Sequence, residues 1–171
     1  MHYLVQQFFG RKRLMTGKRY ALVMGASGDI GSSCVKELAK EGWSIYCHYY
    51  QNESKMREIV QSLMKMYPHQ EFFMVQYDMT DTKHLDQFLS SIYALELIVF
   101  AMGHTEYALL TDLEEEHIDR LWQVHLKTPI LLCQKLQNKL SVSKSGRIIF
   151  IGPVVLWKLF IVQLKVDKKV L

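Results

Sequence analysis

Hydrophobic and polar positions follow two different rhythms along this chain. Short, nearly continuous apolar runs, typical of buried strands, cover residues 19–25, 44–50, 71–78, 95–103 and 146–152. Apolar side chains recur at helical spacing in the segments between them, over residues 29–43, 53–67, 82–93 and 111–140. Strands separated by helices of this length predict βαβ units, and their near-continuous apolar character fits a parallel sheet covered on both faces.

The predicted fold class is therefore α/β, a doubly wound (Rossmann-like) parallel sheet. Such sheets bind their ligands at the carboxyl ends of the strands. A chain of 171 residues is long enough for one domain with a hydrophobic core. Its content of 49% hydrophobic and 22% charged residues is ordinary for a soluble globular protein.

The net charge of +4 arises at the two ends of the chain. Residues 1–19 carry five basic side chains and no acidic one, and residues 154–171 carry four lysines against Asp167. The stretch between them is acidic overall, so we expect no nucleic-acid-binding face on the domain.

The cysteines indicate the compartment. Cys34, Cys47 and Cys133 are odd in number, widely spaced and outside any metal-ligand pattern, which favours a reducing, cytoplasmic location and no metal site. The first thirteen residues lack the apolar region of a signal peptide. No apolar run is long enough for a membrane span, so we expect no membrane partner.

A glycine cluster, GASGDIG, lies between the first predicted strand and the first predicted helix. Gly25 permits a tight turn, Gly28 lets a ligand approach the backbone, and Gly31 lets the helix pack close to the strand. The N–H groups that open the helix would then face an anion. The spacing differs from G-x-G-x-x-G, and taken alone the cluster also fits a plain β–α turn without a ligand.

Residues 16–153 together resemble the short-chain dehydrogenase/reductase family. The turn is similar to the family's T-G-x-x-x-G-x-G motif, with Met24 in place of the Thr and Asp29 in place of the middle Gly. The segments YDMTD, IVFAMG and GRIIFIG are similar to the ends of the family's third, fourth and fifth strands, although Ala101 stands where an Asn is expected.

This resemblance implies a dinucleotide site. Its residues would be Gly25, Ser27, Gly28, Asp29, Ile30, Gly31, Asp78, Met79, Ala101 and Gly103. We expect NADPH (NADP) rather than NAD, because no carboxylate follows the second strand between Cys47 and Asn52 to hold a ribose 2′-hydroxyl. Asp29 would disfavour a phosphate unless its carboxylate points outward as a helix cap.

Within the family, the chain is most similar to 3-oxoacyl-carrier-protein reductase-like enzymes, and more sharply to elongation factor P 5-aminopentanone reductases. That likeness implies a carbonyl substrate, either a small molecule or a protein-bound group, and a homo-oligomer formed through residues 111–140. His125 stands where the family's active-site tetrad has an Asn. It fits equally well as a helix residue on the side that faces the sheet.

The family's chemistry is hydride transfer to a carbonyl, with a Tyr as proton donor, a Lys that lowers the pKa of that Tyr, and a Ser that holds the carbonyl oxygen. The sequence contains no Tyr-x-x-x-Lys, and Pro153 stands at the position of the Ser. We therefore expect this chain to be catalytically inactive. The alternative function is a nucleotide-binding or helix-mediated interaction module without catalysis.

The two ends of the chain do not fit the family pattern. Residues 1–14 are interpreted as a misassigned start or a basic arm, and residues 15–153 as a partial dinucleotide-binding domain whose sheet is incomplete at its C-terminal side. A permissive choice of codons for residues 156–171, read in another frame, encodes Tyr-Ser-Ala-Ile-Lys. Residues 154–171 are therefore interpreted as a frameshifted catalytic segment, against the rival interpretation of a basic tail with its own role.

Overall fold

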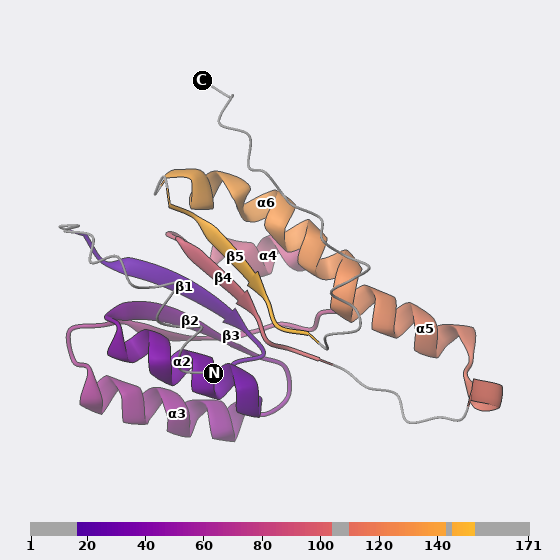
Figure 1. The fold of residues 1–171 in the computed structure, drawn as a ribbon, viewed down its shortest axis with the longest axis horizontal. Coiled ribbons are helices and arrows are strands. Elements are labelled where there is room, and N and C mark those ends of the chain that lie inside the picture. Colours follow the sequence, from indigo (N-terminus) through magenta and orange to yellow (C-terminus); the bar gives the residue numbers. More distant parts are fainter. Residues whose placement is uncertain (1–16, 104–109, 143–144, 153–171) are drawn as a thin grey trace.

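The computed structural model describes residues 17–103, 110–142 and 145–152 (Figure 1). The predictions made for residues 1–14, for Pro153 and for residues 154–171 lie outside this part of the chain. The strands are β1 (Arg19–Met24), β2 (Trp43–Tyr49), β3 (Phe72–Gln76), β4 (Leu97–Phe100) and β5 (Arg147–Phe150). The α-helices are α2 (Asp29–Lys40), α3 (Glu53–Met66), α4 (Leu85–Ser90), α5 (Glu115–Trp122) and α6 (Thr128–Val142).

The strands form one parallel sheet in the order β3-β2-β1-β4-β5. Val23 in β1 pairs with Cys47 in β2 on one side and with Val99 in β4 on the other. The chain therefore builds outward from β1 to β3, and then crosses over to build outward again from β4. This confirms the doubly wound prediction and places the reversal of strand order between β1 and β4, where ligands of such sheets bind.

Helices cover both faces of the sheet, α2 and α3 on one side and α4 and α6 on the other (Figure 1). Because alternate side chains of a strand point to opposite faces, Ile45 packs in the core beneath α2 and α3, whereas Tyr46 packs in the other core. Every residue of β2 is buried. This two-sided burial is the reason the strands read as continuous apolar runs.

Two helical regions differ in detail from the sequence pattern. The helix expected over residues 82–93 is confined to α4, because the carboxylate of Asp81 accepts hydrogen bonds from the backbone N–H groups of Lys83 and His84 and holds them in a turn. The region expected to be helical over 111–140 is covered by a 3₁₀ turn (Leu110–Asp112), α5 and α6, which ends at Val142. A π-helical segment, Gln123–Lys127, joins those two helices. None of the helices in the described ranges is long and apolar enough to cross a membrane.

Candidate functional site

The glycine turn that joins β1 to α2 is shaped by two close approaches of backbone. Gly25 has φ +79°, in the left-handed region, and a Cβ placed on it would lie 2.6 Å from Cα of Met102 beyond β4. A Cβ on Gly31 would lie 2.0 Å from the carbonyl oxygen of Gly25. Side chains at these two positions would push β4 and α2 away from the turn, so the close backbone contacts of the turn require glycine at both positions.

The amino end of α2 faces the carboxyl edge of the sheet without a side-chain cap. Gly28 is the N-cap residue; its N–H donates to the Gly25 carbonyl at 3.0 Å, and its own carbonyl accepts from Ser32 N–H at 2.8 Å. The N–H groups of the first helical turn have no partner within a helix and carry partial positive charge. Gly28 adds no side chain to obstruct them, so this end of α2 suits an anion such as a phosphate.

Asp29 opens α2, yet its carboxylate does not occupy this anion-binding position. Its side chain is 99% exposed, and Oδ1 lies 3.1 Å from Nζ of Lys55 in the first turn of α3. The carboxylate thus points outward, which is the orientation expected if the turn is to accept a phosphate. It does so as the ion-pair partner of Lys55 and not as a helix cap. Sequence reasoning missed Lys55, although its position just after the second strand was a readable signal.

His48, near the end of β2, supports the turn from beneath. Its ring is buried, with Nδ1 2.9 Å from Gly25 N and Nε2 2.9 Å from the carbonyl oxygen of Tyr77. Burial lowers the pKa of His48 to about 4, which keeps the ring neutral. Its own carbonyl accepts from Ala26 N–H at 2.8 Å. In the sequence, His48 is only one of the non-acidic residues between Cys47 and Asn52, and the pattern does not indicate that it connects Gly25 to Tyr77.

The residues after β3 form a fixed wall beside the turn. Asp78 Oδ1 accepts from both the N–H and the hydroxyl of Thr80, each at 2.8 Å. Met79 is buried, and its carbonyl accepts at 2.6 Å from the hydroxyl of Thr128 in α6. Gln123 in the π-helical segment donates to the same Thr128 hydroxyl at 2.9 Å. This chain of hydrogen bonds ties the end of β3 to the helices on that face.

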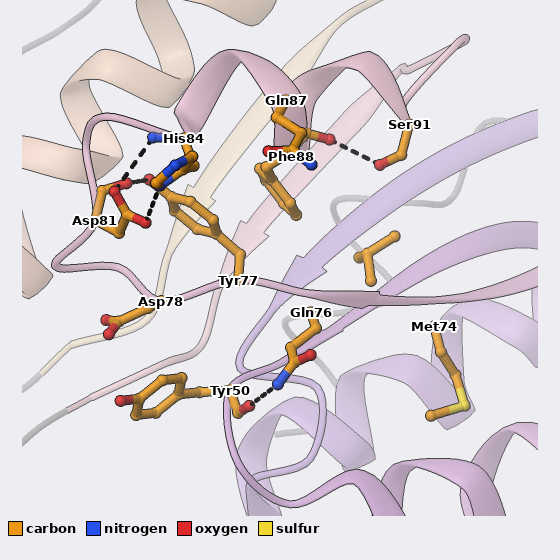
Figure 2. Close-up of a pocket in the computed structure, with 11 residues that line it drawn as sticks. Tyr50, Met74, Gln76, Tyr77, Asp78, Asp81, His84, Gln87, Phe88 and Ser91 are labelled. Atoms are coloured by element: carbon orange, nitrogen blue, oxygen red, sulfur yellow. Dashed lines mark hydrogen bonds and ion pairs between the residues drawn. The ribbon is translucent and has the colours of Figure 1, made fainter.

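A hollow of about 530 Å³ lies between β3 and α4, next to this wall (Figure 2). Tyr50 and Asp78 lie at one end of it, where the Gln76 amide donates to the Tyr50 carbonyl at 3.0 Å. The ring of Tyr77 points toward Asp81, and the Tyr77 hydroxyl donates to the backbone carbonyl oxygen of Asp81. None of the glycine-turn residues lines the hollow. It therefore flanks the end of β3 and leaves the anion-binding position to the turn itself.

The segment after β4 closes the other side of the turn. Ala101 N–H donates to the Met24 carbonyl at 2.9 Å, and Gly103 is exposed. The His125 ring approaches this segment from the π-helical segment: its Cε1 lies 3.7 Å from where a Cβ of Gly103 would stand. The structure thus brings the glycine turn, Gly103 and His125 to one edge, whereas Pro153 falls outside the described residues.

These residues fit a phosphate-bearing ligand. No side chain among the described residues caps the amino end of α2, and the exposed Asp29 carboxylate points outward to pair with Lys55. In the described part of the chain, no cluster of His, Cys, Asp or Glu side chains could hold a metal ion. Burial raises the pKa of the Cys47 thiol to about 12, so that thiol is no nucleophile at neutral pH. The amino end of α2 at this edge of the sheet is therefore suited to an anion.

Comparison with protein families and curated sequences identifies the relatives of this chain. The profile described as short chain dehydrogenase matches residues 19–158. The oxidoreductase YmfI of Bacillus subtilis (strain 168) is 29% identical over 135 residues, 78% of this chain and 55% of that protein. A 3-oxoacyl-[acyl-carrier-protein] reductase of Rickettsia bellii is 27% identical over 135 residues, 79% of this chain and 54% of that protein. The chain spans about half the length of the curated relatives it matches.

Solved structures share the fold. The L-sorbose reductase of Gluconobacter frateurii, complexed with NADPH and L-sorbose, superposes with a TM-score of 0.74 at 18% identity, over 84% of this chain and 56% of that one. The alternative dihydrofolate reductase FolM of Brucella canis, complexed with NADP, gives 0.71 at 24% identity, over 83% and 58%. At these identities the likeness establishes the arrangement of strands and helices.

Proposed function

The chain belongs to the short-chain dehydrogenase family of oxidoreductases, and we propose that its glycine turn binds the pyrophosphate of NADPH in preference to NADH. The observation that carries this proposal is the uncapped amino end of α2 behind a turn closed by Gly25 and Gly31. Asp78 and Met79, at the end of β3, are the residues proposed for the adenine. The hydrogen bonds that Asp78 accepts from Thr80 both use Oδ1, so Oδ2 is the acceptor in this proposal.

The preference for NADPH is a charge argument. No carboxylate lies at the end of β2, where NAD-binding sheets hold the ribose 2′-hydroxyl. Lys55 supplies a cation at the start of the next helix, where a 2′-phosphate would replace that hydroxyl. Its pair with Asp29 is exposed, and exposed pairs contribute about 0–1 kcal/mol, so exchanging the carboxylate for a phosphate costs little.

The cofactor assignment is tested by fluorescence titration of the 171-residue chain with NADPH and NADH. We expect tighter binding of NADPH, and Lys55→Gln should weaken NADPH binding about tenfold while leaving NADH unchanged, as for the loss of one charge-assisted contact. Lys65→Gln, near the other end of α3, is the matched control. A preference for NADH would contradict the assignment, and a folded sample that binds neither dinucleotide would contradict the site.

A nicotinamide cofactor, when bound, supplies the hydride for reduction of a carbonyl. The residues of this chain would bind and orient it: the glycine turn would hold the phosphates, and the His125 ring lies beside Gly103 in the segment after β4. The sequence contains no Tyr-x-x-x-Lys to donate the proton. We therefore infer that the family's carbonyl chemistry, on a small-molecule or carrier-bound substrate, is not completed by this chain.

Turnover is tested by following NADPH oxidation with an acetoacetyl thioester, the substrate type suggested by the 3-oxoacyl reductases among the relatives. The rate should equal that of a Gly25→Asp variant, in which the turn is blocked. A rate clearly above that control would show that other residues supply the proton, and would overturn the inference of inactivity without touching cofactor binding.

A second candidate function, helix-mediated association, rests on an apolar face of α5 and α6. Ile118, Trp122 and Ile130 are each more than half exposed. We infer that residues 111–140 pair with a second copy of the chain, because such a face is costly to leave in water. Sedimentation of the chain against Trp122→Glu tests this: the variant should be monomeric at a concentration where the parent is dimeric, and a monomeric parent would refute it.

A further inference from the structure

The His48 side chain contacts three parts of the chain: the glycine turn, the end of β3 and α4. Nδ1 lies 2.9 Å from Gly25 N in the turn, and Nε2 lies 2.9 Å from the Tyr77 carbonyl at the end of β3. The ring also packs edge-on against Phe88 of α4, with 6.1 Å between ring centroids. With 2% of its surface exposed, the His48 side chain is shielded from solvent.

The two hydrogen bonds determine the protonation state of the ring. The Gly25 N–H is a donor, so Nδ1 must be the unprotonated acceptor; the Tyr77 carbonyl is an acceptor, so Nε2 must carry the proton. A second proton on Nδ1 would set two donors against each other at 2.9 Å. The bridge therefore exists in one neutral tautomer and is broken in the imidazolium form.

We propose that His48 is a positioning residue for the cofactor pyrophosphate: its neutral ring fixes Gly25, and through it the turn that presents the helix N–H groups to the phosphates. The inference rests on the proposed function, since it assumes that the turn binds a dinucleotide. His48 acts through Gly25 and needs no contact with the ligand. Binding of the cofactor would then fall when the ring becomes protonated.

The titratable groups on the elements around His48 do not take the place of its two main-chain partners, the Gly25 N–H and the Tyr77 carbonyl. Those groups are Asp29 on α2, Tyr77 and Asp78 after β3, and Asp81, His84 and Asp86 around α4. Each carboxylate among them has a partner of its own: Asp29 pairs with Lys55, Asp78 bonds to Thr80, Asp81 pairs with His84, and Asp86 pairs with Lys135. Burial is the largest cause that lowers the pKa of His48, to about 4.

Two substitutions separate positioning from simple packing. His48→Asn keeps an acceptor near the place of Nδ1 but does not titrate, whereas His48→Phe fills the space and removes the acceptor. With NADP⁺ at pH 7, we expect His48→Phe to bind about tenfold more weakly, as for one unsatisfied buried donor, and His48→Asn to bind within about threefold of the parent. With adenosine 2′-monophosphate, which has no pyrophosphate, both variants should bind like the parent.

The pH profile gives a readout that packing alone would not move. The affinity of the parent for NADP⁺, divided by that of His48→Asn at the same pH, should fall about twofold between pH 7 and pH 4, because half of the rings are then protonated. Circular dichroism at each pH confirms that the proteins measured are folded. Dividing by the variant removes the titration of the ligand's own phosphates from the comparison.

The outcomes distinguish the two proposals. If the parent binds NADP⁺ but the ratio is flat with pH and His48→Phe binds like the parent, the positioning role is refuted and the proposed function stands. If the folded parent binds no NADP⁺, the proposed function itself fails. Should His48→Phe not fold, the pH ratio between the parent and His48→Asn still decides the matter.

Discussion

Replacing Gly25 by alanine tests whether the turn is held closed by backbone contact. Gly25 and Gly42 both have left-handed backbone, with φ of +79° and +84°. A Cβ on Gly42 would meet nothing nearer than the Arg19 guanidinium at 3.7 Å, whereas on Gly25 it would lie 2.6–2.8 Å from three atoms of Met102. Gly42→Ala therefore measures the cost of the conformation, and Gly25→Ala adds the collision.

The expected magnitudes follow from this difference. A left-handed non-glycine residue costs about 1–2 kcal/mol, and this applies to both variants. Relieving the collision at Gly25 requires the Met102 backbone to move, although the neighbouring Ala101 N–H is bonded to the Met24 carbonyl at 2.9 Å. Overpacking of this kind costs about 1–3 kcal/mol more. We expect Gly25→Ala to lose about 2–5 kcal/mol of unfolding free energy and Gly42→Ala about 1–2 kcal/mol.

Urea unfolding of both variants and the parent measures these losses, with an unchanged slope showing that the unfolded state is unaffected. Titration with NADPH measures the binding affinity of the same variants. Gly42 lies before β2, at the end of the sheet away from the site, so Gly42→Ala should bind as the parent does, and Gly25→Ala should not. Equal destabilisation of the two variants, or normal binding by Gly25→Ala, would refute the reasoning.

Further predictions concern buried polar groups near the site. Because the pKa of His48 is lowered from 6.5 to about 4, the unfolded chain takes up a proton first as the pH falls. Native stability should be full above about pH 6.5 and fall by about 3 kcal/mol on the way to pH 4; urea midpoints across this window should fall less in His48→Asn. Thr128→Val removes the hydrogen-bond partner of the Met79 carbonyl and the Gln123 amide, and it should lower the unfolding free energy by about 1–3 kcal/mol. Thr111→Val, at an exposed hydroxyl, is its control and should stay within about 0.5 kcal/mol of the parent.

The sheet could be predicted from the sequence because its signal is local and repeated. Two-sided burial makes each strand continuously apolar, and a helical period fills each interval, so the order of elements and the parallel topology follow. The start of α2 at Asp29 was also readable from the glycine cluster. The shortness of α4 was not, because it depends on which backbone groups the Asp81 carboxylate bonds, and helical spacing of apolar residues does not report that.

Much of the site could not be predicted for a different reason: its contacts join residues far apart in the chain. The His48 ring meets Gly25 across 23 positions and the Tyr77 carbonyl across 29, and Thr128 meets Met79 across 49. A histidine inside an apolar run gives no periodic signal of its partners. The family resemblance supplied the candidate residues at the strand ends, but it did not indicate which side chains fix their positions.

The contacts that shape the turn have a common origin. The backbone of Met102 after β4 and of Gly31 in α2 lies close to Gly25, and the Gly25 N–H donates to Nδ1 of His48 in β2. All of these residues lie before residue 103, and β5 pairs with β4 on the side away from β1. The geometry of the glycine turn is therefore set by residues 25–102. The proton-donating Tyr-x-x-x-Lys has no counterpart among these residues. We therefore predict that the proposed binding of a dinucleotide does not depend on completion of the carbonyl chemistry.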